Sequence, residues 1–140
     1  MGSKTIRFSR DEMAFLKRSG IAALYLFGSQ ADGTAHAFSD YDFGILLKHP
    51  QRMSDRKRRN DIYQRLLEIF ESKIRRPCNM DIVFLNEAPL QLQFQVIGKG
   101  TVLYEGDPIT RADYHERIFE AYADFLPYQR MFEQATIARL

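Results

Sequence analysis

The sequence predicts an α/β (α+β) fold, in which a small mixed β-sheet of about four strands is flanked by helices. Four short runs of apolar residues have the length of strands, and the segments between them repeat apolar residues with helical period. Several of those segments begin or end at residues that cap helices. Of the 140 residues, 45% are hydrophobic and 13% aromatic, enough for one core. We expect residues 1–140 to form a single domain with a C-terminal helical extension over about 108–140.

The first element is a predicted helix. Ser9 and Glu12 have the spacing of a capping box, in which each residue satisfies the other's backbone N–H. Gly20 ends the helix, because glycine adopts the backbone conformation that closes a helix. We expect Met13 and Leu16 to point toward the core.

Two strands follow, with a loop or short helix between them. Residues 21–27 are almost continuously apolar, which is typical of a central strand covered on both faces. Residues 28–38 are small and polar and predict the loop or short helix. Residues 41–47 predict the second strand, which ends before Pro50.

The middle of the chain predicts a helix over residues 54–71, a third strand over 79–85 and a helix that begins near Asn86 and Pro89. Gly98 and Gly100 end the second of these helices. The apolar positions repeat with helical period and form one face of each helix. They are Ile62, Leu66, Ile69 and Phe70 in the first, and Leu90, Phe94 and Ile97 in the second.

The C-terminal third predicts a fourth strand over residues 101–105 and then helices. Asp107 and Pro108 are a cap and first-turn pair, and Pro127 is expected to break the helix, with a last segment from about Tyr128. Aromatic residues are frequent here, and they either cover the sheet or form a docking surface for a partner. They are Tyr114, Phe119, Tyr122, Phe125, Tyr128 and Phe132.

The residues with the clearest chemistry lie at the end of the first strand and at the start of the second. Gly28 allows a tight turn and close approach of the backbone to a ligand, and Ser29 presents a hydroxyl and an N–H where anions bind well. After a gap of ten residues come Asp40 and Asp42, and alternation along a strand points both carboxylates the same way. Two adjacent carboxylates repel unless a cation neutralises them, and Mg²⁺ prefers such oxygen ligands.

Asp81 supplies a third carboxylate in an otherwise apolar strand. An unpaired charge buried there would be costly, so Asp81 is expected to have a partner. If its strand neighbours the one carrying Asp42, the carboxylates converge and allow catalysis by two metal ions. Alone, an Asp-x-Asp pair is usually a solvated turn and a lone serine is usually a helix cap. The combination of spacings favours a site for a Mg²⁺-bound nucleoside triphosphate.

At these residues the chain resembles the minimal nucleotidyltransferases, the MNT (MntA) type of the DNA polymerase β-like superfamily. The resemblance rests on Gly28-Ser29, the ten-residue gap, Asp40-x-Asp42 preceded by Ser39, and the strand of Asp81. It implies the nucleotidyltransferase fold, ATP as substrate and two Mg²⁺ ions. It also implies metal binding by Asp40, Asp42 and Asp81, with Asp81 as base for the acceptor hydroxyl, and phosphate binding by Gly28, Ser29 and Ser39.

Proteins of this size in the family are commonly antitoxins beside a HEPN-domain ribonuclease toxin (HepT). The resemblance therefore implies transfer of AMP to a tyrosine of such a toxin, with a hetero-oligomer formed through the C-terminal helices. Two alternatives stay open. One is a binding-only antitoxin with a vestigial nucleotide site. The other is an enzyme that modifies a small molecule such as an aminoglycoside.

One position departs from the family pattern, in which arginines often follow Gly-Ser. Asp32 stands in this loop instead, which leaves the cation that neutralises the phosphates unassigned. Lys48, Arg75 and Arg76 are candidates. The basic stretch over residues 52–60 is interpreted as a solvated helix face or as a surface for RNA or an acidic partner.

Bulk properties predict a cytoplasmic protein without a membrane span. The first nine residues lack the apolar stretch of a signal peptide, and no apolar run is long enough to cross a bilayer. The net charge of +2 is too small to argue for nucleic acid as a direct partner. His36, His49 and His115 have no metal-ligand spacing, and zinc is not proposed.

Overall fold

The computed structural model describes residues 6–28, 41–74 and 78–138. In chain order the elements are α1 (Arg10–Arg18), β1 (Ile21–Phe27), β2 (Tyr41–Leu47), the 3₁₀ turn η1 (Pro50–Ser54), α3 (Arg56–Lys73), β3 (Met80–Phe84), the 3₁₀ turn η2 (Leu85–Glu87), α4 (Leu90–Lys99), β4 (Thr101–Glu105) and α5 (Pro108–Ala138).

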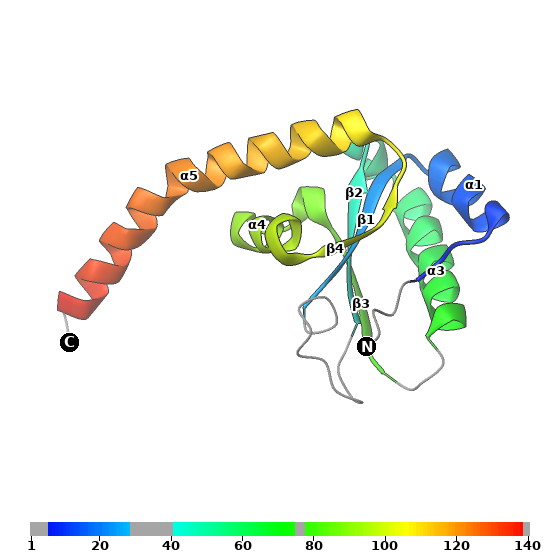
Figure 1. The fold of residues 1–140 in the computed structure, drawn as a ribbon, viewed down its shortest axis with the longest axis horizontal. Helices are drawn as coiled ribbons and strands as arrows, with labels where there is room; N and C mark the ends of the chain where they lie inside the picture. The colour runs from blue at the N-terminus through cyan, green and yellow to red at the C-terminus, as the bar shows by residue number, and fades with distance from the viewer. Residues whose placement is uncertain (1–5, 29–40, 75–77, 139–140) are drawn as a thin grey trace.

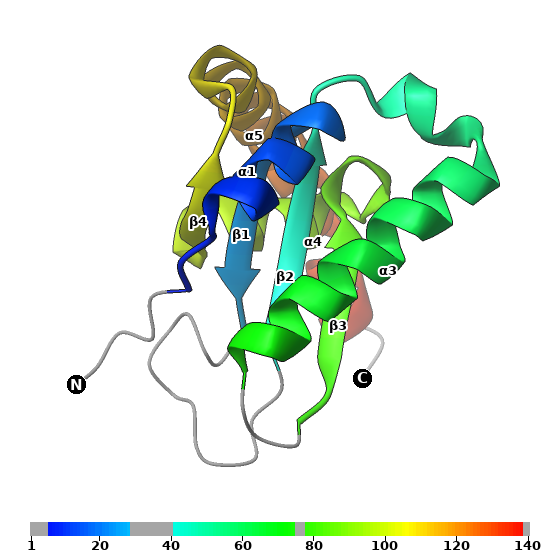
Figure 2. The ribbon, with the colours of Figure 1, turned by 90° about the vertical axis from the view of Figure 1, so that its right-hand side faces the viewer.

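The four strands form one mixed sheet in the order β3-β2-β1-β4, as Figure 2 shows. β1 is antiparallel to both β2 and β4, whereas β2 and β3 are parallel. This arrangement confirms the predicted fold class. The parallel pair matters for the site, because β2 and β3 run in the same direction with their starts side by side.

Helices cover both faces of the sheet (Figure 2). On one face, Phe43 and Ile45 of β2 belong to a buried cluster with Leu16 of α1 and Leu66 and Phe70 of α3. The opposite face is built around a second buried cluster. Its members are Ala22, Ala23, Tyr25, Leu46, Leu85, Val96, Tyr114 and Ile118. β1 supplies residues to both clusters, which explains its nearly continuous apolar sequence.

The first helix begins as its sequence predicts. Ser9 Oγ accepts a hydrogen bond from the Glu12 N–H at 3.1 Å, and Glu12 Oε1 accepts one from the Ser9 N–H at 2.8 Å, which completes the capping box. Leu16 is fully buried as expected, but the prediction for Met13 is wrong. Met13 is 48% exposed, because this nine-residue helix meets the core through Phe15 and Leu16 instead.

The C-terminal segment corrects a second prediction. Pro127 does not end the helix, and α5 continues through it as one helix of 31 residues. Proline removes the hydrogen bond to the carbonyl four residues earlier, here Ala123. Ala123 is exposed, so water can bond that carbonyl and the helix can bend to relieve the clash. Figure 1 shows α5 passing α4 and then extending away from the sheet.

Within the described part of the chain, no helix has both the length and the apolar content that crossing a membrane requires.

Candidate active site

Three strands bring the predicted site residues to one end of the sheet. The strand register pairs Phe27 of β1 with Asp42 of β2, and Asp42 with Asp81 of β3. Tyr41 donates its backbone N–H to the Asn79 carbonyl at 3.0 Å, which fixes the start of β2 against the segment that leads into β3. The carboxylates were expected to converge if the strand of Asp81 neighbours the strand of Asp42, and the two strands are neighbours.

Both carboxylates lie on the face of the sheet that α4 and α5 cover. Tyr41 and Phe43 belong to the cluster on the α1–α3 face, so Asp42 between them points to the other face. The same alternation applies to Asp81, which lies between Met80 and Ile82. Asp42 is half-buried and Asp81 is exposed. Asp81 therefore needs no partner to offset the cost of burial, because the start of this edge strand is open to solvent.

Gly28 lies directly against Asp42. Its backbone has φ +75°, a conformation that side-chain-bearing residues rarely adopt. A Cβ atom built on Gly28 would lie only 2.5 Å from Asp42 Oδ2. Both the backbone conformation and the neighbouring carboxylate therefore require glycine here. The turn that ends β1 thus presents bare backbone beside a carboxylate.

The donor set suits a hard cation such as Mg²⁺. Asp42 and Asp81 are carboxylates on adjacent strands, paired in register on a face with solvent access, and carboxylate oxygens are ligands that Mg²⁺ prefers. Among the described residues alone, no group of three His, Cys, Asp or Glu side chains could hold a metal ion. Several residues predicted for this site or its neighbourhood lie outside the described ranges. These are Ser29, Asp32, Ser39, Asp40, Arg75 and Arg76. His36, which was expected to be a surface histidine without a metal role, also lies outside them.

Lys48 is excluded as the cation of this site. It follows the far end of β2, six residues from Asp42, which corresponds to about 20 Å along a strand. Its Nζ lies 2.8 Å from Asp107 Oδ2. The hydrogen bond from Lys48 and one from the Thr110 N–H lower the pKa of Asp107 to about 2. Lys48 thus anchors the start of α5 at the opposite end of the sheet.

Lys99 is a basic residue near this site that was not among the candidates drawn from the sequence. A cavity of about 250 Å³ is lined by Phe27, Gly28, Leu92, Gln95 and Lys99, so this lysine borders the same cavity as the glycine turn. The available signal was its place between Gly98 and Gly100, where α4 turns back into β4. By themselves, those glycines indicate only the end of a helix.

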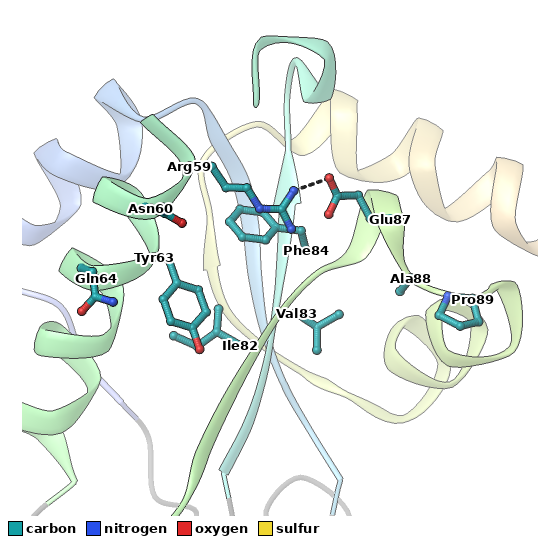
Figure 3. Close-up of a pocket in the computed structure, with 10 residues that line it drawn as sticks. All are labelled: Arg59, Asn60, Tyr63, Gln64, Ile82, Val83, Phe84, Glu87, Ala88 and Pro89. Atoms are coloured by element: carbon teal, nitrogen blue, oxygen red, sulfur yellow. Dashed lines mark hydrogen bonds and ion pairs between the residues drawn. The ribbon is translucent and has the colours of Figure 1, made fainter. Parts of the chain in front are cut away.

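A larger cavity, of about 590 Å³, lies along β3 between α3 and the η2–α4 segment (Figure 3). Arg59 crosses it to form an ion pair with Glu87, and its guanidinium carbon lies 4.4 Å from the centre of the Phe84 ring. Of the predicted site residues that the structure describes, none lines this cavity. We therefore place the chemistry at the Gly28 end of the sheet.

The sequence and fold of this chain can be compared with those of known proteins. A family model described as polymerase beta, nucleotidyltransferase, matches residues 13–109, which run from α1 through β4. Comparison with curated protein sequences gives no match.

Solved structures share the fold. A structure of a toxin–antitoxin with AMP-PNP is 21% identical, with a TM-score of 0.66, and the match covers 89% of this chain and 94% of that chain. A second structure is that of a tri-AMPylated Shewanella oneidensis HEPN toxin in complex with MNT antitoxin. It is 19% identical, with a TM-score of 0.60, and the match covers 89% of this chain and 92% of that chain. A structure of the toxin–antitoxin MntA-HepT is 18% identical, with a TM-score of 0.59, and the match covers 91% of this chain and 95% of that chain.

Proposed function

This chain belongs to the polymerase beta nucleotidyltransferase family, and from that premise we propose that it transfers AMP from ATP to a tyrosine of a HEPN-domain toxin and thereby neutralises it. The observation that carries the proposal is the alignment of Gly28, Asp42 and Asp81 at one end of the sheet. The similar structures support the choice of substrate and partner, since one is a toxin–antitoxin with AMP-PNP and another contains an AMPylated HEPN toxin.

The proposed reaction is one displacement at the α-phosphorus of ATP. The tyrosine oxygen forms a bond to the α-phosphorus, and the bond from that phosphorus to the bridging oxygen breaks, so pyrophosphate leaves. Asp81 is exposed and lies beside Asp42, and we assign it the proton of the tyrosine hydroxyl. Backbone donors at Gly28 and Ser29 hold the phosphates, together with Ser39.

Mg²⁺ would be held by Asp42 and Asp81, with Asp40 as the third ligand. When bound, Mg²⁺ ions neutralise phosphate charge and favour both the attacking and the leaving oxygen. The protein itself fixes the relative positions of the acceptor hydroxyl and the α-phosphorus.

The outer part of α5 is the proposed docking element for the toxin. The family match ends at residue 109, so nearly all of α5 lies outside it. Tyr128 is 63% exposed and Phe132 73% exposed, and Met131 and Ile137 are also exposed. Exposed aromatic and methionine side chains are enriched at protein interfaces. We therefore propose one nucleotidyltransferase domain whose C-terminal extension binds the partner.

A growth-rescue experiment separates catalysis from simple binding. A HEPN-domain toxin is expressed alone, with the wild-type chain, or with the Asp42→Asn, Asp81→Asn double variant. We expect growth only with the wild-type chain. Equal rescue by the double variant, at equal protein levels, would show that binding alone neutralises the toxin.

A further inference from the structure

We propose that the cavity between the end of β1 and α4 holds the nucleoside triphosphate, with Lys99 neutralising the phosphates and Gln95 selecting adenine. The inference rests on the proposed function, because it assigns residues to the nucleotide of that reaction. Its basis is a set of residues that the fold brings together from two distant parts of the sequence.

The connection from α4 to β4 places Lys99 beside the glycine turn. Thr101 is the register partner of Leu26 in the antiparallel pair of β4 and β1, so the residues before Thr101 run alongside those after Leu26. A Cβ atom on Gly100 would lie 3.2 Å from the Leu26 carbonyl oxygen and would collide with the Val96 carbonyl oxygen. This close passage holds Lys99 against the end of β1.

The side chains of α4 that line this cavity become more polar toward the end of the helix, turn by turn. Leu92, Gln95 and Lys99 line the cavity and are spaced by three and four residues, as neighbours on one helix face are. With a rise of about 1.5 Å per residue, Gln95 lies about 6 Å along the axis from Lys99, and Leu92 about 10 Å. The face therefore runs from a cation through an amide to an apolar side chain.

This order corresponds to the chemistry of a nucleotide. Lys99 is exposed beside Gly28, where the anion-binding backbone lies, so its ammonium group faces the phosphates. Phe27 and Leu92 are half-buried and offer apolar surface to the faces of a base. Gln95 lies between the two groups and presents its amide to the edge of the base.

The amide of Gln95 distinguishes adenine from guanine. A glutamine amide has one acceptor oxygen and one donor NH₂ group, and adenine offers a donor at N6 beside an acceptor at N7. Guanine offers two acceptors on the corresponding edge, so one of its groups would face the amide oxygen without a hydrogen bond. The cavity therefore favours ATP over GTP through Gln95.

Calorimetry with α,β-methylene-ATP and α,β-methylene-GTP tests both assignments, because these analogues bind without transferring the nucleotide. With Mg²⁺ present, we expect Lys99→Ala to raise the Kd for the ATP analogue about tenfold and Lys99→Arg to restore most of the affinity. We expect Gln95→Ala to reduce the preference for the ATP analogue from about tenfold to near unity. Lys57→Ala and Gln91→Ala are controls, since both residues are exposed and neither lines the cavity.

Failure of this inference differs from failure of the proposed function. If the wild-type chain binds the ATP analogue but Lys99→Ala and Gln95→Ala behave like their controls, the assignment of this cavity is overturned while nucleotide transfer stands. If the wild-type chain binds neither analogue, both the inference and the proposed function are overturned.

Discussion

Gly28 and Asp42 lie so close together that a side chain at position 28 would collide with the Asp42 carboxylate. The carboxylate occupies the volume of a Cβ atom at position 28, and the backbone there already has φ +75°. The contact ties the end of β1 to the candidate metal ligand on β2. Gly20 is a useful comparison, because it has φ +73° but no atom within 4 Å of its virtual Cβ.

Replacing each glycine by alanine separates backbone strain from the loss of the site. We expect Gly28→Ala and Gly20→Ala each to lower the free energy of unfolding by about 1–3 kcal/mol, because both force alanine into a left-handed conformation. Only Gly28→Ala should also reduce AMP transfer, by about 100-fold, because Asp42 must move. Denaturant unfolding and a transfer assay measure the two effects. Equal transfer by both variants would contradict the role of the contact.

His115 forms part of a polar network between β1 and α5. Its Nε2 lies 2.7 Å from the Tyr25 hydroxyl, which also accepts a hydrogen bond from Arg111 Nε at 3.3 Å. Burial and the positive charge of Arg111 lower the pKa of His115, while the Glu105 carboxylate acts in the opposite direction. The folded chain thus resists protonation of His115.

The lowered pKa predicts a loss of stability on acidification. An unfolded histidine binds a proton as the pH falls through about 6.5, whereas folded His115 does so only at lower pH. Protonation therefore favours the unfolded chain in this window, and the melting temperature should fall between pH 7.5 and 6. His115→Gln should reduce this fall, with His49→Gln as control. A pH dependence that is unchanged in His115→Gln would refute the role of the network.

The two halves of α5 have different environments. Tyr114 is 2% exposed and donates its hydroxyl to Gln93 Oε1 at 2.7 Å, and Tyr122 stacks on Phe94 with ring centres 3.9 Å apart. The second half of the helix extends away from the sheet (Figure 1), and several of its large apolar side chains are exposed, among them Tyr128, Met131 and Phe132. Tyr114 and Tyr122 thus match the first interpretation, in which aromatics cover the sheet. A docking surface on the second half of α5 is our proposal, and it uses the aromatics that are exposed there.

Substitutions in the second half of α5 should affect the partner and not the fold. We expect Tyr128→Ser and Phe132→Ser each to weaken binding of the HEPN-domain toxin about tenfold or more, because aromatic anchors dominate interface energies. The melting temperature should stay within about 1 °C of wild type, since exposed side chains contribute little to folding. Phe119→Ser is the contrasting variant, because Phe119 packs edge-on against Phe94 and its loss should lower the melting temperature.

Local sequence signals predict the elements well where they act over a few residues. The bounds of β1, β2 and β4 and the capping box at Ser9 follow from apolar runs and side-chain spacing alone. Pro127 shows the limit of such reasoning. Whether a proline ends a helix depends on solvent at the carbonyl it leaves free, and exposure on α5 is a property of the whole fold.

At the scale of the whole molecule, the candidate site contains residues that the local sequence predicts and a residue that only the fold brings near them. Gly28, Asp42 and Asp81 were predictable because each ends or begins a strand with a clear pattern. The proposed phosphate-neutralising residue, Lys99, was not predictable, and the sequence candidate Lys48 lies at the other end of β2, where it pairs with Asp107. Lys99 is 71 positions from Gly28 and reaches it only through the pairing of β4 with β1. Only the strand order reveals that proximity.

Strand order also assigns the two proposed roles of the chain to different regions. The proposed nucleotide chemistry belongs to the end of the sheet where β1, β2 and β3 align, and the proposed toxin binding belongs to the outer half of α5. Substitutions in one region should therefore leave the other intact.

Transfer of labelled AMP tests the central claim most directly. The purified chain is mixed with the HEPN-domain toxin, Mg²⁺ and ATP labelled at the α-phosphate, and the label on the toxin is followed. We predict that wild type labels a tyrosine of the toxin. We further predict that Asp42→Asn and Asp81→Asn each lose at least about 100-fold in rate, whereas Asp61→Asn, an exposed carboxylate on α3, transfers like wild type. Undiminished transfer by Asp42→Asn and Asp81→Asn would contradict the account.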